Sequence, residues 1–496
     1  MTKNIMVQGT MSSAGKSLLV AGLCRVFHQD GLQVAPFKSQ NMALNSFITK
    51  EGLEMGRAQV VQAEAAGIEP SVLMNPVLLK PCSDKGSQVI VRGEPVGTMD
   101  AVSYYEYRSS LKNIITDCYS HLAERNDVIV IEGAGSPAEI NLNEDDIVNM
   151  GMAELVDAPV ILVADIDRGG VFAQIYGTIM LLPPEQRARI KGVIINKFRG
   201  DVEILRPGLA MIEEKTGVPV IGVLPYLNVD IDDEDSLSDR KEGGIKPVDI
   251  AVIQFPRISN ATDFTPLSRQ ESIRLRYVRR TADFGNPDLI ILPGTKSTMP
   301  DLLWMRQNGL EALVKKAAER GIPIIGVCGG YQMLGQTLSD PDHTELGGSL
   351  HGLSLLPVDT VFYSEKTRLQ STGTVCPQNG FFHSLSGTSL TGYQIHMGQS
   401  KPTAPAVPFV RFDDGTEDGV VCGNVCGTYL HGLFDGELAA RVTELLLHQK
   451  GITPEESKSA ILDAATFHQT QYDILANALR DHLNLDAIYQ ILNNGS

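Results

Sequence analysis

Residues 324–334, Ile324-Ile325-Gly326-Val327-Cys328-Gly329-Gly330-Tyr331-Gln332-Met333-Leu334, decide how the second half of this chain is expected to fold. An apolar run ends abruptly at Cys328, glycines flank that cysteine, and an amphipathic segment follows. This order predicts a strand, a sharp turn and a helix, with the cysteine at the apex as an exposed nucleophile. A helix N-terminus also favours the thiolate, which is the reactive form of a cysteine. The alternative is an ordinary buried cysteine, but the full G-x-C-x-G-x-Q spacing favours the nucleophile.

A cysteine nucleophile needs a base within hydrogen-bonding reach, and the chain has 10 histidines. His431 is our first choice because it follows a strand-like stretch and precedes a glycine. His396, within the strand-like segment 391–397, is the rival. Spacing alone does not decide between the two histidines.

A second motif lies near the N-terminus, Gly9-Thr10-Met11-Ser12-Ser13-Ala14-Gly15-Lys16-Ser17. A strand-like segment precedes it and an apolar, helix-compatible segment follows it, as in phosphate-binding loops. In such a loop the backbone N–H groups face the phosphates, Lys16 reaches the β and γ oxygens, and Ser17 holds Mg²⁺. The loop departs from the usual G-x-x-x-x-G-K-[ST] pattern because five residues, not four, separate Gly9 from Gly15.

Acidic residues near other predicted elements are candidates for the same metal. The predicted strand 127–131 delivers Glu132 to the sheet edge, which is where a P-loop domain holds Mg²⁺. Glu54, in a predicted helix over residues 52–66, is by contrast more safely interpreted as a surface charge.

Two further polar clusters follow predicted strands. Residues 159–164 end in Asp165-Ile166-Asp167-Arg168, which suits either a metal and anion site or a structural turn. Residues 33–38 end in Lys38-Ser39-Gln40-Asn41, at the end of a strand where open α/β sheets bind ligands, although a solvated loop is an equal alternative.

Composition limits the partners and the location. The net charge of −17, without a cluster of basic residues, argues against nucleic acid as a partner. No apolar run approaches the ~20 residues that span a bilayer, and the N-terminus lacks the pattern of a secretory signal, so we expect a cytoplasmic protein away from membranes. Seven scattered cysteines fit a reducing compartment. Cys422 and Cys426, the one close pair, are explained by core packing, and they lack the further ligands of a metal site.

The chain of 496 residues is too long for one core. Strand-like segments alternate with helix-compatible ones, which predicts an α/β fold with parallel sheets covered by helices. We expect a P-loop domain over residues 1–227, an acidic linker over 228–247, a second α/β domain over 248–440 and a helical extension over 441–496. Within the second domain, residues 301–320 are expected to form one helix.

With these motifs in place, nearly the whole chain resembles the adenosylcobyric acid synthase family of glutamine-hydrolysing ligases in cobalamin biosynthesis. The first half is similar to P-loop ATPases of the dethiobiotin-synthetase type, whose loop has the same five-residue spacing. The second half resembles class I glutamine amidotransferases. The most discriminating stretches are residues 40–46, 165–172 and 326–332.

The resemblance implies which residues act. It places the nucleophile at Cys328 and the base at His431, with N–H groups of Gly329 and Gly294 forming an oxyanion hole. ATP would lie on the loop with its adenine read by Asn196. The residues implied for ATP are Gly9, Thr10, Gly15, Lys16, Ser17 and Asn196, and those for Mg²⁺ are Ser17, Glu132 and, less surely, Glu54.

The implied reaction is ATP-dependent amidation of the b, d, e and g carboxylates of adenosylcobyrinic a,c-diamide. Glutamine would be the ammonia donor, and cobalt would be present only within the corrinoid substrate. The partners would be small molecules alone. Neither the sequence nor the resemblance fixes the oligomeric state.

The chain departs from the wider amidotransferase pattern at two positions. Leu433 stands where most class I enzymes have a glutamate, so the group that orients His431 is unassigned. Gln394 stands where this branch usually has a glutamate. Three alternatives remain: a cobyrinic acid a,c-diamide synthase, a ligase that uses free ammonia, and a partitioning-type ATPase with an inactive amidotransferase domain.

Overall fold

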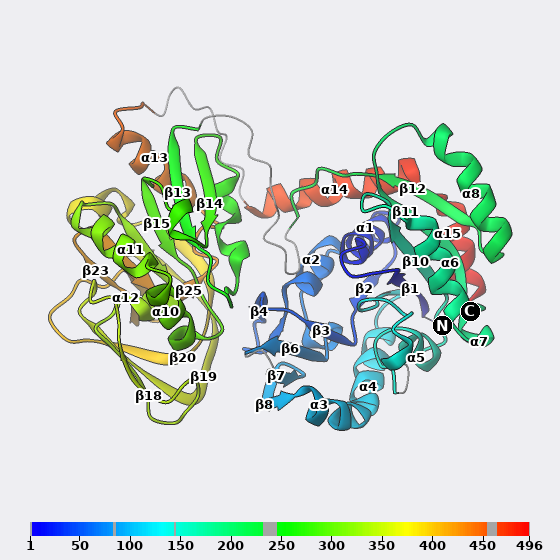
Figure 1. The fold of residues 1–496 in the computed structure, drawn as a ribbon, viewed down its shortest axis with the longest axis horizontal. Coiled ribbons are helices and arrows are strands. Elements are labelled where there is room, and N and C mark those ends of the chain that lie inside the picture. Colours follow the sequence, from blue (N-terminus) through cyan, green and yellow to red (C-terminus); the bar gives the residue numbers. More distant parts are fainter. Residues whose placement is uncertain (1, 83–85, 143–144, 232–245, 454–463, 496) are drawn as a thin grey trace. The chain divides into compact units, whose positions relative to one another are not determined.

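The computed structural model describes residues 2–82, 86–142, 145–231, 246–453 and 464–495, and it divides into two compact units (Figure 1). The first unit comprises Met1–Ala43, Met55–Glu234 and Phe467–Ser496, and the second comprises Leu44–Glu54 and Asp235–Thr466. The expected linker over 228–247 lies largely outside the described residues, since 232–245 are among those not described. The units differ from the continuous domains that we expected, because each contains a segment from the other half of the sequence.

The main sheet of the first unit has six parallel strands. Across the sheet they are β12 (Val220–Pro225), β11 (Ile190–Phe198), β10 (Val160–Asp165), β1 (Lys3–Gly9), β9 (Val128–Glu132) and β2 (Val34–Phe37). Every residue of β9 and β10 is buried, as expected for central strands covered on both faces. The helices and short 3-10 turns of this unit are α1 (Lys16–Gln29), α2 (Arg57–Ala65), η1 (Val72–Met74), α3 (Ala101–Arg108), η2 (Ser109–Leu111), α4 (Lys112–Ala123), η3 (Ile140–Leu142), α5 (Met150–Leu155), α6 (Val171–Leu181), α7 (Pro184–Arg187), α8 (Val202–Thr216), α14 (Ala464–His482) and α15 (Leu485–Asn494).

The last two helices join the core of the first unit. Leu475 and Leu479 of α14 share a buried cluster with Leu23 of α1. The helices approach closely because Gly22 lacks a side chain: a Cβ there would lie 2.6 Å from Leu479 Cδ2. The expected extension over 441–496 is therefore not one body, since α13 (Leu438–Gln449) belongs to the second unit.

A small sheet in the first unit was not expected from the sequence. Its order is β3 (Gln40–Met42), β6 (Val77–Pro81), β7 (Gly86–Val91) and β8 (Glu94–Asp100). Only β3 and β6 run parallel; the other pairs are antiparallel.

The second unit combines two sheets. The first follows the order β14 (Ile273–Val278), β13 (Val248–Ile253), β15 (Leu289–Leu292), β16 (Ile324–Val327), β24 (Val425–Thr428) and β23 (Val420–Cys422), parallel except for β23. The second contains β18 (Gly348–His351), β17 (Thr337–Asp340), β19 (Val358–Val375), β20 (Ser389–Pro402), β25 (Leu430–His431), β21 (Val410–Phe412) and β22 (Glu417–Asp418). The helices and turns are η4 (Ala261–Phe264), α9 (Thr265–Ser268), η5 (Thr281–Asp283), α10 (Thr298–Gln307), α11 (Leu310–Glu319), α12 (Gly329–Leu334), η6 (Gly380–Leu385) and α13. The α/β fold expected for both halves is confirmed.

Two expected helices have different bounds. The helix predicted over 301–320 is two helices, α10 and α11, because Gly309 between them adopts a left-handed φ of 75°. The helix predicted over 52–66 begins only at Arg57, because Gly56 is still extended. Residues 46–56 instead form a hairpin, in which β4 (Ser46–Ile48) pairs with β5 (Glu54–Gly56).

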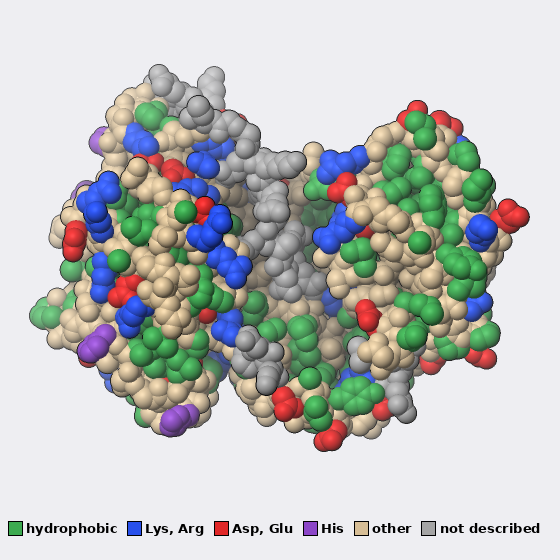
Figure 2. Space-filling view, in the orientation of Figure 1, with side chains coloured by type: hydrophobic (Ala, Val, Ile, Leu, Met, Phe, Trp, Pro, Cys, Tyr) green, Lys and Arg blue, Asp and Glu red, His purple; other side chains and the backbone are tan. Residues whose placement is uncertain are grey.

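Hydrophobic side chains gather over the region of α8 in Figure 2, where Ile204 and Met211 are exposed and Ile212 is the one buried residue of that helix. No helix within the described ranges combines the length and the apolar character needed to cross a membrane.

Candidate active sites

The turn at Cys328 has the geometry expected of a nucleophile. Strand β16 ends at Val327, α12 begins at Gly329, and Cys328 between them has φ 50° and ψ −109°. A positive φ at a residue other than glycine is uncommon and often marks a functional site. The turn requires Gly330, where a Cβ would lie 1.9 Å from the carbonyl oxygen of Leu292. Cys328 is 7% exposed, and its Sγ lies 3.6 Å from the carbonyl oxygen of Ile395.

His431 lies beside this cysteine. It ends the short strand β25 and is 1% exposed. Burial alone lowers the pKa of His431, but the carboxylate of Asp263 and the sulfur of Cys328, which also hydrogen-bonds to the ring, outweigh it and raise the pKa to about 10. The structure therefore brings the predicted nucleophile and the preferred base together.

Asp263 is the group that orients His431. Its Oδ2 lies 2.7 Å from His431 Nδ1, and its Oδ1 accepts the N–H of Gly432 at 3.0 Å. An ionised carboxylate only accepts hydrogen bonds, so Nδ1 carries a proton and Nε2 is the atom left for chemistry at the sulfur. Sequence analysis missed Asp263 because it stands 168 residues before the histidine, in a short 3-10 turn without a motif.

The glycines predicted to form the oxyanion hole lie around the same pair. A Cβ at Gly294 would lie 2.9 Å from Cε1 of His431. A Cβ at Gly329 would lie 3.2 Å from the backbone nitrogen of Thr295. Both glycines thus permit the close approach of the Gly294 turn, the histidine and the start of α12.

The rival histidine, His396, is held in a different role. Its Nδ1 lies 2.7 Å from the carbonyl oxygen of Gly398, and its ring stacks on Tyr429 with centroids 3.7 Å apart. Burial lowers the pKa of His396 to about 4, so the ring is neutral near pH 7. Of the two departures from the amidotransferase pattern, Leu433 is a core residue and Gln394 donates to Ser371 Oγ at 3.0 Å.

The phosphate-binding loop lies between β1 and α1. Gly15 adopts a left-handed φ of 98°, and a Cβ there would lie 2.0 Å from Asn196 Nδ2. Lys16 is buried, and its Nζ donates to the carbonyl oxygens of Met11 at 3.2 Å and Gly135 at 3.1 Å. The contact with Met11 keeps the ammonium group against the loop, where the lysine of a P-loop reaches phosphate oxygens.

Two other predicted nucleotide residues contact this region. The Asn196 side chain donates to the carbonyl oxygen of Ala14 at 2.9 Å, and its Oδ1 accepts the Lys197 N–H at 2.8 Å. Thr10 Oγ1 donates to Gln174 at 3.2 Å. An asparagine amide can make further hydrogen bonds beyond these two, so the contacts leave Asn196 able to meet a base.

A buried polar cluster lies behind the loop. Glu132 Oε1 accepts from Ser17 Oγ at 2.8 Å and forms an ion pair with Lys38 Nζ at 2.9 Å, and Oε2 accepts from Gln62 at 2.5 Å. Burial alone raises the pKa of Glu132, but the ammonium of Lys38 and these hydrogen bonds outweigh it and hold the pKa below its usual value. Lys38 is 4% exposed, so the stretch that follows β2 is not a solvated loop.

The other acidic candidates have different partners. Glu54 lies in the second unit, where its carboxylate pairs with Lys366 Nζ at 2.5 Å. Asp165 pairs with Lys197 at 2.8 Å, and Asp167 pairs with Arg199 at 3.0 Å. Ser17 and Glu132 are the two predicted metal residues that the structure brings together.

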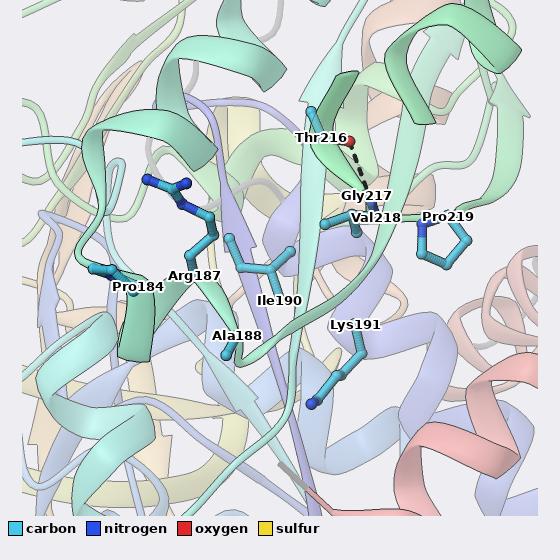
Figure 3. Close-up of a pocket in the computed structure, with 9 residues that line it drawn as sticks. All are labelled: Pro184, Arg187, Ala188, Ile190, Lys191, Thr216, Gly217, Val218 and Pro219. Carbon is cyan, nitrogen blue, oxygen red and sulfur yellow. Dashed lines mark hydrogen bonds between the residues drawn. The ribbon is translucent and has the colours of Figure 1, made fainter. Parts of the chain in front are cut away.

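A cavity of about 470 Å³ lies elsewhere in the first unit (Figure 3). It is lined by Pro184, Arg187, Ala188, Ile190, Lys191, Thr216, Gly217, Val218 and Pro219. These residues precede or begin β11 and β12, so the cavity lies at the amino ends of those strands. Open α/β sheets bind ligands at the carboxyl ends of their strands, and we therefore do not assign the nucleotide to this cavity.

Comparisons with known proteins also find a nucleotide-binding domain in the first half of the chain and a glutamine amidotransferase domain in the second. Residues 5–236 match the CobQ/CobB/MinD/ParA nucleotide binding domain, and residues 249–439 match the CobB/CobQ-like glutamine amidotransferase domain. Cobyric acid synthases of Ruminiclostridium cellulolyticum and Lachnoclostridium phytofermentans are each 54% identical to the whole chain, which covers 98% and 100% of those proteins. That of Citrobacter koseri is 52% identical over 99% of both chains. The chain therefore belongs to the cobyric acid synthase family of glutamine-hydrolysing ligases.

Proposed function

We propose that this chain catalyses the ATP- and glutamine-dependent amidation of the b, d, e and g carboxylates of adenosylcobyrinic a,c-diamide, giving adenosylcobyric acid. The observation that carries the proposal is the presence in one chain of an oriented Cys328–His431 pair and a phosphate-binding loop backed by Glu132. The full-length similarity to proteins named cobyric acid synthase favours this substrate over cobyrinic acid.

Glutamine hydrolysis would begin at Cys328. The thiolate attacks the side-chain amide carbon of glutamine, and the N–H groups of Gly329 and Gly294 stabilise the oxyanion, each by about 3–4 kcal/mol. His431, protonated at Nε2 in the resting pair, gives that proton to the leaving ammonia. The same ring then takes a proton from water as water attacks the thioester, and glutamate leaves.

Amidation needs a separate activation step, because a free carboxylate is a poor electrophile. ATP would lie on the loop from Gly9 to Ser17, with Lys16 and the loop N–H groups meeting the phosphates. A corrinoid carboxylate oxygen takes the γ-phosphoryl group and ADP leaves. Ammonia then attacks the acyl carbon, displaces phosphate and leaves an amide.

The residues behind the loop suit Mg²⁺. The Ser17 hydroxyl and the Glu132 carboxylate are hard oxygen ligands within 2.8 Å of each other. Both would hold the ion, which would offset phosphate charge during transfer. Lys38, already paired with Glu132, adds a second positive charge beside the same position.

The test measures glutamate release and corrinoid amidation in the same preparation. Wild type should release glutamate from glutamine and amidate adenosylcobyrinic a,c-diamide when ATP is present. Cys328→Ala should lose glutamate release but keep amidation with free ammonia. Lys16→Ala should show the reverse, keeping basal glutaminase activity and losing amidation with either nitrogen source.

The outcomes separate the alternatives. Amidation of cobyrinic acid in preference to its a,c-diamide would assign the chain to the a,c-diamide synthase reaction. Absence of glutaminase activity under every condition would leave an ammonia-dependent ligase, and Cys328→Ala with wild-type glutamine-dependent activity would refute the nucleophile.

A further inference from the structure

Residues 44–54, called here the inserted segment, fold as part of the second unit although the chain on both sides belongs to the first. Ile48 is fully buried against Tyr393 and Ile395. The Ile48 carbonyl accepts from Gln370 Nε2 at 2.9 Å. Glu54 ends the segment in a buried ion pair with Lys366. The segment is thus fixed to the amidotransferase fold at both its middle and its end.

The inserted segment holds the turn that carries Asp263. The N–H of Ser46 donates to Asn260 Oδ1 at 3.0 Å, and the N–H of Ala261 donates to Asn45 Oδ1 at 3.2 Å. Asn260 is the first residue of this turn and has a left-handed φ of 52°. Two hydrogen bonds therefore fix the start of the turn three residues before the carboxylate that binds His431.

The same segment also holds the ring that covers His431. The carbonyl oxygen of Ser46 accepts from the Tyr393 hydroxyl at 2.9 Å. The Tyr393 ring lies nearly parallel to the imidazole, with centroids 5.4 Å apart and planes at 19°. Ser46 thus hydrogen-bonds to Asn260, which begins the turn carrying Asp263, and to Tyr393, whose ring stacks on the imidazole of His431.

We infer that the inserted segment positions His431, by holding both the turn that carries Asp263 and the Tyr393 ring that stacks on the imidazole. The role of this positioning in glutamine hydrolysis rests on the proposed function. Asn45, Ser46 and Tyr393 are positioning residues, because they act through Asp263 and His431 rather than on the substrate.

Two substitutions test the positioning with little change in shape. Tyr393→Phe removes the hydroxyl and keeps the stacked ring, and Asn45→Ala removes the acceptor for the Ala261 N–H. We expect each to lower the kcat of basal glutaminase about three- to tenfold, with KM for glutamine changed less than twofold. The double variant should lose about tenfold or more. Asn45→Asp, which keeps the acceptor, should restore activity to within about twofold of wild type.

A second readout reports on His431 directly. Alkylation of Cys328 by iodoacetamide as a function of pH needs no ATP, corrinoid or glutamine, so it tests the positioning even if the proposed amidation fails. The basic limb of this profile should move to lower pH in both variants, because a misplaced Asp263 favours the imidazolium less. Gln370→Ala is the matched control, since it removes a hydrogen bond from the segment at Ile48, away from Asn260 and Tyr393; it should leave kcat and the profile within about twofold of wild type.

The kinetic and alkylation measurements together decide whether the inserted segment positions His431. Loss of kcat with a moved profile, rescue in Asn45→Asp and unchanged ammonia-dependent amidation would establish the inference. Wild-type kinetics and a wild-type profile in Tyr393→Phe, which is the variant safest for folding, would overturn it. An equal loss of glutaminase and ammonia-dependent activity would also overturn it, because the defect would then not lie at His431.

Discussion

Replacement of Asp263 by asparagine tests the orientation of His431 most directly. The carboxylate accepts two hydrogen bonds, from His431 Nδ1 at 2.7 Å and from the Gly432 N–H at 3.0 Å. An asparagine has one acceptor oxygen, so one of these donors must face its NH₂ group. If the oxygen stays with Gly432, the NH₂ donates to Nδ1 and moves the ring proton to Nε2, which faces the sulfur. The neutral ring can then no longer accept a proton from Cys328.

The size of the effect follows from the pKa of His431. Its rise from 6.5 to about 10 corresponds to roughly 5 kcal/mol in favour of the imidazolium, and Asp263 is the largest contribution that raises it. If Asp263 supplies most of this difference, its removal costs roughly 3–4 kcal/mol, or about a 10²- to 10³-fold loss in glutaminase kcat. The basic limb of the pH profile should also move well below pH 10.

The assay is glutamate release between pH 6 and pH 10, with ammonia-dependent amidation measured in parallel. Asp283→Asn is the matched control, because this acid lies in a neighbouring turn and pairs with exposed Arg280. It should behave as wild type, and Asp263→Asn should keep amidation with ammonia. An Asp263→Asn enzyme within about threefold of wild type, with an unmoved basic limb, would refute the assignment of Asp263.

Three further predictions concern other contacts. Gly294→Ala places a Cβ 2.9 Å from His431 Cε1, so glutaminase kcat/KM should fall at least about tenfold while ammonia-dependent amidation persists; an unchanged value would show that the ring has room to move. Glu132→Gln replaces the buried carboxylate that pairs with Lys38 by a neutral amide, and it should lower the free energy of unfolding in urea by about 3–5 kcal/mol. ATP hydrolysis should fall as well, and a stability within about 1 kcal/mol of wild type, roughly the value of one ordinary hydrogen bond, would contradict this prediction. Because folding raises the pKa of His431, its stabilising contribution is complete below about pH 6.5 and is lost as pH rises to about 10. Urea unfolding should therefore show a larger fall in stability from pH 7 to pH 10 in wild type than in Asp263→Asn, and parallel curves would argue against the raised pKa.

The parts of the molecule that the sequence predicted are those set by neighbouring residues. The elbow at Cys328 and the loop from Gly9 to Ser17 are each encoded within about ten residues, where glycines must stand at fixed positions beside an apolar strand. A Cβ 1.9 Å from a carbonyl at Gly330 or 2.0 Å from an amide at Gly15 shows why these positions tolerate no side chain. Such local requirements leave a readable pattern in a single sequence.

The small sheet and the bounds of two helices could not be predicted from the sequence, because the local patterns there are weak. Strands β6 to β8 alternate poorly, and β8 is mostly exposed, so its residues lack the period of a half-buried strand. The break between α10 and α11 depends on one left-handed glycine within an otherwise helical pattern. An isolated glycine in a helix is tolerated often enough that the sequence did not mark this one as an end.

The orientation of His431 depends on contacts between residues far apart in sequence, and for that reason no local motif predicts it. Asp263 meets its histidine across 168 positions, and Asn45 meets Ala261 across 216. The carboxylate that most class I enzymes place two residues after the histidine is here a core leucine, Leu433, so the fold supplies the charge from another segment. The backbone at the start of the Asp263 turn is held by hydrogen bonds with residues 45 and 46. Residues 45 and 46 belong to the 40–46 stretch, which is among the most discriminating parts of the sequence for this family. Their hydrogen bonds to the Asp263 turn are a structural reason for that stretch to have a specific sequence.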